Sequence, residues 1–225
     1  MDADKGVSRA SRHITPNSWN GTNRALTMAT SKSSTRSRRS GRPSRHAGVA
    51  QGGILYQLDL VYARAGVDLP RARTVAPHEI PLPYRALLVH ESDMTLTLER
   101  HFGGRVVLRP LSTFTIGKWY FRRVLLVQER SGRPVEMGAI RMKLGVFSAR
   151  IRRQILANRI PLGRILRDGK VEYTSRPCAF LSVMPNGEMM GAFWMREPCP
   201  LYGRRTEMYQ EGAKIGDIVE VLPLV

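Results

Sequence analysis

Charged side chains inside apolar, strand-like segments are the residues of this sequence most able to do chemistry. Arg122 and Arg123 lie in the middle of Lys118–Gln128, which reads KWYFRRVLLVQ. Successive side chains of a strand point to opposite faces, so one of the two arginines is expected to point towards the core. A buried guanidinium is costly unless it meets an anion. In one interpretation, one arginine pairs with an internal carboxylate such as Glu136 and the other is solvated. In the other interpretation, the buried arginine binds an anionic ligand.

A carboxylate near the C-terminus raises the same question. Glu220 lies between Val219 and Val221 in the last apolar segment of the chain. Burial there would raise the pKa of this carboxyl group unless a cation held it in its charged form. A surface position on an edge strand is the alternative interpretation.

Several classes of enzyme are excluded by motifs that the sequence lacks. It contains no P-loop, no GxGxxG after a strand, no GxSxG and no HExxH, and its five histidines show no metal-ligand spacing. Cys178 and Cys199 are too few for a disulfide framework, which favours a reduced, cytoplasmic compartment. No apolar run approaches the 18 or so residues that a membrane-spanning helix needs, so a soluble protein is expected.

The positive charge is concentrated at the N-terminus. The 225 residues carry a net charge of +18 and are 42% hydrophobic, while residues 1–50 contain ten Lys and Arg and only two Asp. Ser31–Ser44 consists almost entirely of Ser, Arg, Lys, Thr, Gly and Pro, which predicts a disordered tail. This tail could bind polyanions such as nucleic acids non-specifically, act as a targeting peptide or have no specific role, and Met28 could be the true start. Residues 51–225 are expected to form one domain.

Periodicity and turn residues predict an antiparallel sheet with a few helices. Expected helices cover Gly53–Arg64 and Ser148–Asn158, and a third is capped by Ser92 or Asp93, runs through Met94 and Glu99 and stops at Gly103-Gly104. Pro161–Arg164 is a loop or a helix start. Expected strands cover Arg105–Leu111, Lys118–Gln128, Arg133–Leu144, Tyr173–Met184, Glu188–Arg196, Leu201–Tyr209 and Lys214–Leu224, and Pro70–Pro83 is a connector. Helices do not alternate with strands, so the fold class is α+β with a single antiparallel sheet and helices packed on it.

Five segments, in order, resemble blocks of the chorismate lyase (chorismate pyruvate-lyase) family, whose members make 4-hydroxybenzoate. The segments are Leu87–Glu99 (LLVHESDMTLTLE), Trp119–Leu126 (WYFRRVLL), Pro161–Leu166 (PLGRIL), Leu201–Arg205 (LYGRR) and Ile218–Pro223 (IVEVLP). The resemblance spans residues 84–225, about 60% of the chain, and is closer to divergent, lyase-like members than to the compact bacterial enzyme.

The resemblance implies a site and a reaction. Arg122 matches the arginine that holds the ring carboxylate, Glu220 matches the glutamate near the ring 4-hydroxyl, and Met94 and Leu162 match positions whose backbone amides contact the ligand. It also implies a chorismate lyase-like fold, loss of pyruvate from chorismate, and no metal or organic cofactor. Chorismate has two carboxylates, and for the second anchor we expect Arg141, with Arg164 or Arg204 behind it.

The chain also departs from the family pattern. Arg122-Arg123 replaces an Arg-Glu pair, and the Gly-Arg of the following strand is here Gly138-Ala139-Ile140-Arg141. The sequence therefore predicts a lyase, with a non-catalytic protein that binds a small aromatic carboxylate as the alternative. A nucleic-acid-binding protein is the third hypothesis, although the body shows no RNP-like aromatic pair and no KH glycine loop. A monomer is expected.

Overall fold

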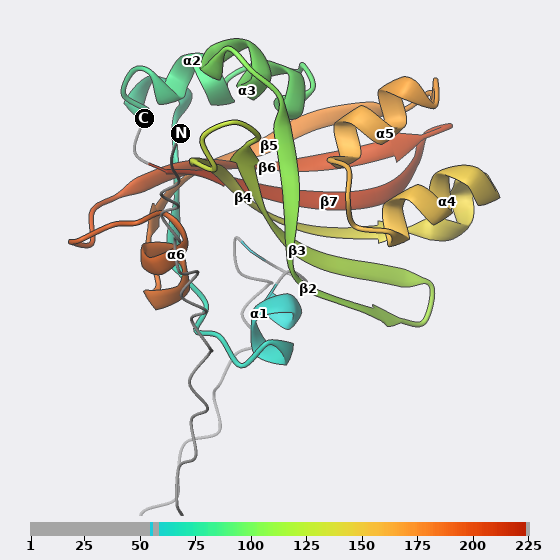
Figure 1. The fold of residues 1–225 in the computed structure, drawn as a ribbon, viewed down its shortest axis with the longest axis horizontal. Helices are drawn as coiled ribbons and strands as arrows, with labels where there is room; N and C mark the ends of the chain where they lie inside the picture. Colours follow the sequence, from blue (N-terminus) through green and yellow to red (C-terminus); the bar gives the residue numbers. More distant parts are fainter. Residues whose placement is uncertain (1–54, 56–58, 224–225) are drawn as a thin grey trace, which may run out of the picture. The chain divides into compact units, whose positions relative to one another are not determined.

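Seven antiparallel strands form one sheet in the computed structural model, which describes Leu55 and residues 59–223 (Figure 1). Their order across the sheet is β1-β5-β6-β7-β4-β3-β2. The strands are β1 (Arg71–Val75), β2 (Val106–Ile116), β3 (Trp119–Gln128), β4 (Pro134–Lys143), β5 (Thr174–Met184), β6 (Leu201–Gln210) and β7 (Ala213–Leu222). The predicted α+β class with a single antiparallel sheet is confirmed. The predicted disordered tail, residues 1–50 with Met28, lies outside the described residues.

Helices pack on both faces of this sheet. They are α1 (Asp59–Arg64), α2 (Tyr84–Leu88), α3 (Met94–Phe102), α4 (Ala149–Leu156), α5 (Leu162–Asp168) and α6 (Gly187–Ala192). Figure 1 shows α2, α3 and α5 on one side of the sheet and α1 and α6 on the other. Within the described residues, none of these helices has the length and apolar character needed to cross a membrane.

Two of the helix boundaries follow from capping residues that the sequence analysis identified. Asp93 accepts a hydrogen bond from the backbone N–H of Leu96, and Ser148 accepts one from Ile151. At the other end of α3, Gly103 adopts a φ of 65°, a left-handed conformation that glycine reaches without steric cost. The predicted helices at these places are therefore confirmed.

Two predicted segments have a different structure. The Pro70–Pro83 connector contains β1, which pairs with β5 at the edge of the sheet. The strand predicted over Glu188–Arg196 is wrong, because α6 occupies its first part. Asn186 caps α6 by accepting a hydrogen bond from the N–H of Met189, so the Asn186-Gly187 pair begins a helix rather than a hairpin turn.

The central strands are buried on both faces, and each face has its own core. Phe121, Leu125 and Val127 of β3 pack with residues of α1 and α6. Val124 and Leu126 point to the opposite face, where they pack with residues of α2 and α3. Both arginines of β3 are therefore buried, one on each face, and the expectation that one would be solvated is wrong.

Candidate functional site

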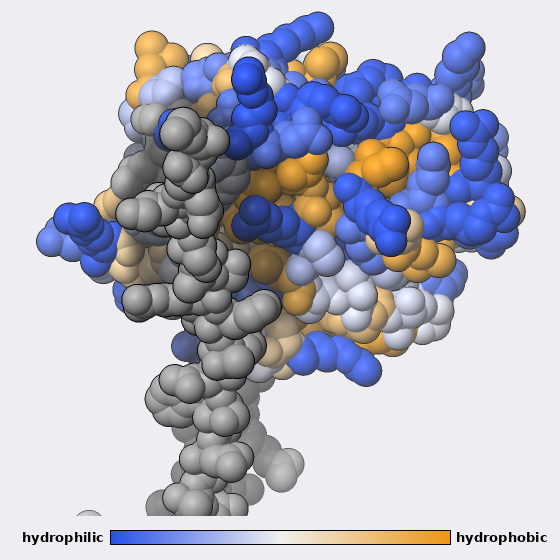
Figure 2. Space-filling model, in the orientation of Figure 1, coloured by the Kyte–Doolittle hydropathy of each residue, from blue (hydrophilic) through white to orange (hydrophobic). Residues whose placement is uncertain are grey.

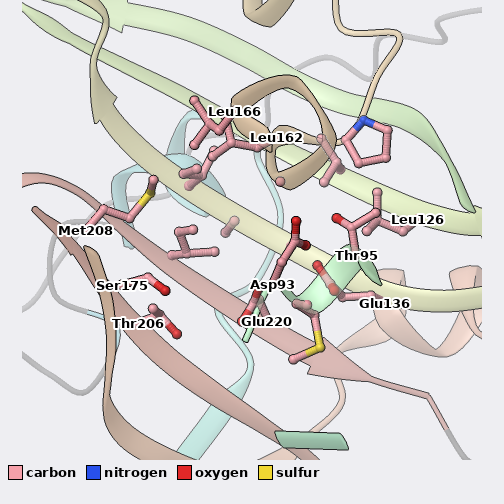
Figure 3. Close-up of a pocket in the computed structure, with 18 of the residues that line it drawn as sticks. Asp93, Thr95, Leu126, Glu136, Leu162, Leu166, Ser175, Thr206, Met208 and Glu220 are labelled. Atoms are coloured by element: carbon pink, nitrogen blue, oxygen red, sulfur yellow. The ribbon is translucent and has the colours of Figure 1, made fainter. Parts of the chain in front are cut away.

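A cavity lies between the sheet and the helices α3 and α5. The cavity volume is about 80 Å³, which is enough for several water molecules or a small organic molecule. Its polar lining consists of Ser92, Asp93, Thr95, Arg122, Glu136, Tyr173, Ser175, Arg204, Thr206 and Glu220. Its apolar lining includes Met94, Leu108, Val124, Leu126, Ile140, Leu162, Leu166, Met208 and Ile218. Figure 3 shows Asp93, Glu136 and Glu220 grouped between Leu162 and Leu166 on one side and Ser175 and Thr206 on the other.

Sheet register explains why these side chains meet. Gly138 of β4 lies opposite Val124 of β3 and Glu220 of β7, and Glu220 lies opposite Arg204 of β6. Residues opposite each other in antiparallel strands share a face, so this row crosses the floor of the cavity. Gly138 has no side chain, and the side chains of Glu136 and Val124 close over it, 3.1 and 3.3 Å from the position that a Cβ would take.

Arg122 brings a buried positive charge to the cavity. It is 2% exposed, and its contacts are weak: its Nη1 donates to the backbone oxygen of Ile155 at 3.5 Å and to Oδ1 of Asn158 at 3.4 Å. Its Nε has no hydrogen-bond partner, and no carboxylate of the described residues forms an ion pair with it. Burial lowers the pKa of this guanidinium from its usual value, but an arginine stays protonated at neutral pH.

Arg123 is equally buried but fully paired, on the opposite face of the sheet. Its two terminal nitrogens each donate to Glu188 of α6 at 2.6 Å. Its guanidinium also lies 4.9 Å from the ring centre of Tyr62, whose pKa is raised to about 12, mainly by burial. The carboxylate partner is therefore Glu188 and not Glu136, and each of the three guanidinium nitrogens of Arg123 already donates a hydrogen bond within the protein.

Glu220 is a central residue of the sheet, since β7 lies between β6 and β4. Its Oε2 accepts from Nε of Arg204 at 2.6 Å, and it is 7% exposed, so the edge-strand alternative is wrong. Arg204 donates further to the backbone oxygens of Leu88 and His90, at 3.2 and 2.8 Å. These bonds tie the connection between α2 and α3 to the sheet, and both charges are neutralised within the pair.

Glu136 lies two residues before Gly138 and is 4% exposed. Its Oε2 is buried without a hydrogen-bond partner among the described residues, and its Oε1 lies 3.1 Å from the position that a Cβ on Gly138 would take. Burial is the main cause that raises the pKa of Glu136 well above its usual value, and the nearby Glu220 raises it further. Its surroundings therefore favour the uncharged form of this carboxyl group. The sequence suggested Glu136 only as an ion-pair partner of an arginine, although a glutamate in an apolar strand is a signal of a buried carboxyl group.

Two helices contribute their first residues to the cavity. Met94 begins α3 and Leu162 begins α5, and both line the cavity. Contact of their backbone amides with a ligand, which the resemblance implied, stays a prediction. Asp93 lies between these helices: it caps α3 and accepts from Arg167 of α5 at 3.3 Å. Its carboxylate leaves no space beside Gly163, where an added Cβ would lie 2.4 Å from Oδ1.

The arginines expected as a second anchor are engaged elsewhere. Arg141 does not line the cavity: it pairs with Asp217 at 2.6 Å and lies 4.1 Å from the ring centre of Trp119. Arg164 forms an ion pair with Glu99 of α3. The structure thus brings Arg122, Glu220, Met94 and Leu162 to one cavity, and places Arg141 on the opposite face of β4.

Exposed basic residues lie on α5, which covers the cavity, and on the neighbouring helix α4. Arg150, Arg152 and Arg153 of α4 and Arg167 of α5 are exposed. Figure 2 shows hydrophilic residues over this part of the surface, with hydrophobic residues visible between them. Such a surface raises the local concentration of small anions.

The comparisons with known proteins found similarity at the level of structure alone. No protein-family model matches the sequence, and no curated protein matches it. The solved structures similar to this chain include PhnF from Mycobacterium smegmatis, with 10% identity and a TM-score of 0.45 over 60% of this chain and 65% of that one. The isolated effector domain of PhnF has 10% identity and a TM-score of 0.46, over 60% of this chain and 91% of that domain.

Two further similar structures carry more explicit descriptions. One is the ligand-binding domain of a putative GntR-family transcriptional regulator from Bordetella bronchiseptica, with 12% identity and a TM-score of 0.39 over 52% of this chain and 85% of that one. The other is the C-terminal domain of a histidine utilization repressor from Pseudomonas syringae, with 10% identity and a TM-score of 0.37 over 53% and 92%. Identities this low concern the fold alone, so no residue role is transferred.

The prediction of a lyase-type enzyme is wrong. The similar solved structures are described as effector, ligand-binding and repressor domains, and none of those reported above is described as a lyase. The cavity is consistent with this correction. Chorismate is a dianion, whereas of the two arginines that line the cavity Arg204 is already neutralised by Glu220. Glu220, the expected proton-transfer group, is held in the same ion pair.

Proposed function

We propose that this domain binds a small aromatic carboxylate, without converting it, and that Arg122 holds the carboxylate. The observation that carries the proposal is the Arg122 guanidinium, 2% exposed, without a carboxylate partner and with an unpartnered Nε in the wall of a cavity. A buried charge without a counter-ion is costly, and an anionic ligand would remove that cost. The planar guanidinium suits a carboxylate because it can donate two parallel hydrogen bonds.

The other walls favour a flat, apolar ligand body. Val124 and Ile140 extend from the sheet, and Leu162 and Leu166 extend from α5 above it. The exposed arginines of α4 favour an anion on approach. Ligand sites commonly combine such apolar walls with a few polar groups that fix the orientation.

Isothermal titration of the full-length chain with benzoate and benzamide tests the proposal. The two molecules share their ring and size and differ in charge, so we expect benzoate to bind at least about tenfold more tightly. Arg122→Lys keeps the charge but loses the planar fork, and we expect it to weaken benzoate binding by about tenfold.

Arg123→Lys is the matched control, because it changes the neighbouring residue of the same strand, equally buried but on the other face. Its dissociation constant for benzoate should stay within about twofold of the wild-type value. Equal binding of benzoate and benzamide, or equal losses in the two variants, would contradict the proposal. Incubation with chorismate should release no pyruvate above the background of the protein-free solution.

Several expectations from the sequence stay predictions. They concern non-specific nucleic-acid binding by residues 1–50, the monomeric state and a cytoplasmic location.

A further inference from the structure

The two neighbouring buried arginines of β3 have side-chain partners that differ in charge. Arg123 donates with both terminal nitrogens to the carboxylate of Glu188, at 2.6 Å. Arg122 instead donates with Nη1 to the amide oxygen Oδ1 of Asn158, at 3.4 Å. An amide oxygen accepts a hydrogen bond without carrying a negative charge. The contact therefore holds the Arg122 guanidinium in place and leaves its positive charge uncompensated.

The backbone at the end of α4 fixes the position of Asn158. The helix ends at Leu156, and Asn158 adopts a left-handed conformation with a φ of 50°. Asparagine and aspartate reach this conformation more readily than most other residues with a side chain. The N–H of Asn158 also donates to the backbone oxygen of Ile155, at 3.2 Å. Asparagine thus suits this turn, and aspartate would fit the same backbone.

Three hydrogen bonds fix the orientation of the Asn158 amide. Its Oδ1 accepts from the hydroxyl group of Tyr120 at 3.0 Å as well as from Arg122. Its Nδ2 donates to the backbone oxygen of Leu156 at 2.9 Å. Tyr120 and Arg122 are two residues apart in β3 and share a face of the sheet, so both donors reach the same oxygen. A rotated amide would turn its N–H groups towards the guanidinium, which accepts no hydrogen bond.

A carboxylate in place of this amide would change the charge of the site with little change in shape. Aspartate would bring a negative charge within ion-pair distance of Arg122, as Glu188 does for Arg123 on the other face. The guanidinium would then have a permanent counter-ion, and an incoming anion would have to displace it. The residue type at position 158 therefore decides whether the charge of Arg122 is available.

We infer that Asn158 is a positioning residue that sets the charge selectivity of the cavity, because its uncharged amide orients Arg122 and leaves the positive charge to an anionic ligand. The inference rests on the proposed function. It assigns the preference for an anion to a residue behind Arg122 that does not itself line the cavity.

The test measures benzoate and benzamide binding to full-length variants by isothermal titration. Asn158→Asp should weaken benzoate binding by at least about tenfold and abolish the preference for benzoate over benzamide. Asn158→Gly removes the amide and tolerates the left-handed backbone. Because the charge of Arg122 stays free, this variant should keep the preference for benzoate. The lost orienting bond should weaken benzoate binding by about threefold to tenfold.

Asn186→Asp is the matched control. Asn186 caps α6 with its Oδ1 and donates with its Nδ2 to the backbone oxygen of Asp68, so the substitution makes the same chemical change beside a helix on the other face of the sheet. Its affinity for benzoate should stay within about twofold of the wild-type value. Circular dichroism checks that all three variants fold, and Asn158→Gly decides alone if Asn158→Asp does not.

The outcomes separate this inference from the proposed function. A wild-type preference for benzoate that persists in Asn158→Asp would overturn the inference and leave the proposed function standing. Unchanged benzoate affinity in Asn158→Gly, or an equal loss in Asn186→Asp and Asn158→Asp, would do the same. Equal binding of benzoate and benzamide by the wild-type chain would overturn both.

Discussion

The contact between Asp93 and Gly163 links the two helices that cover the cavity, and a single methyl group tests it. A Cβ on Gly163 would lie 2.4 Å from Oδ1 and 2.6 Å from Oδ2 of Asp93, closer than any real contact. Asp93 would have to move away, losing its cap on α3 and its bond to Arg167. Loss of a cap costs about 1 kcal/mol, and a partly exposed ion pair contributes about 0–1 kcal/mol. We therefore expect Gly163→Ala to destabilise the protein by about 1–2 kcal/mol.

Gly191→Ala is the matched control. Gly191 is also a helical glycine, in α6, but nothing lies within 4 Å of its added Cβ. Alanine there should stabilise the protein by about 0.4–1 kcal/mol, because it restricts the unfolded chain. The two Gly→Ala changes are thus expected to have opposite signs.

Thermal unfolding, followed by circular dichroism, measures both changes. For a domain of this size 1 kcal/mol corresponds to about 2–4 °C, so Gly163→Ala should lower Tm by about 2–8 °C. In an Asp93→Ala background the clash is absent, and Gly163→Ala should no longer destabilise. Equal effects of Gly163→Ala in the two backgrounds would refute the steric explanation.

Two other perturbations address the buried charges. The pKa of Glu136 is raised in the folded state, so its contribution to stability is lost as the pH rises above about 4.5. In chemical denaturation, the unfolding free energy of Glu136→Gln should therefore increase relative to that of the wild type, by at most about 1.4 kcal/mol per pH unit. A difference between the two that does not change with pH would contradict this. Asp217 forms ion pairs with Arg141 and Lys214 on the face of the sheet opposite the cavity. Asp217→Asn should therefore lower the unfolding free energy by about 3–5 kcal/mol and leave the affinity for benzoate unchanged. An unchanged Tm or a weaker affinity for benzoate would contradict this.

Local patterns were sufficient to predict most of the sheet and its two best-capped helices. The segment around Arg122 combines β-branched and aromatic residues, and the structure has a strand there. Asp93 and Ser148 cap helices through bonds that span only three residues, so a short stretch of sequence contains the whole signal. The Asn186-Gly187 pair begins a hairpin or a helix equally well, and burial of Met189 against the sheet favours the helix.

The partners of the buried charges depended on strand register, which no local pattern reveals. Arg122 pairs with Ile140, so Arg141 falls opposite Phe121 and faces away from the cavity. A bulge near Leu126 in the same strand pair shifts this alternation, and the sequence does not show it. Neither the Arg204–Glu220 ion pair nor the isolation of Glu136 could be predicted without that register.

The most direct measurement of the central claim is the NMR signal of the Arg122 Nε–H group during a titration of the full-length chain with benzoate. This group has no partner in the structure, and the Arg122→Lys variant identifies its resonance by its loss. We expect the Arg122 signal to shift progressively and saturate as the carboxylate accepts its hydrogen bond, while the Nε–H signal of Arg123, which bonds to Oγ of Ser112 on the other face, stays in place. A saturating benzoate titration that leaves the Arg122 signal unmoved would contradict the claim that this arginine holds the ligand.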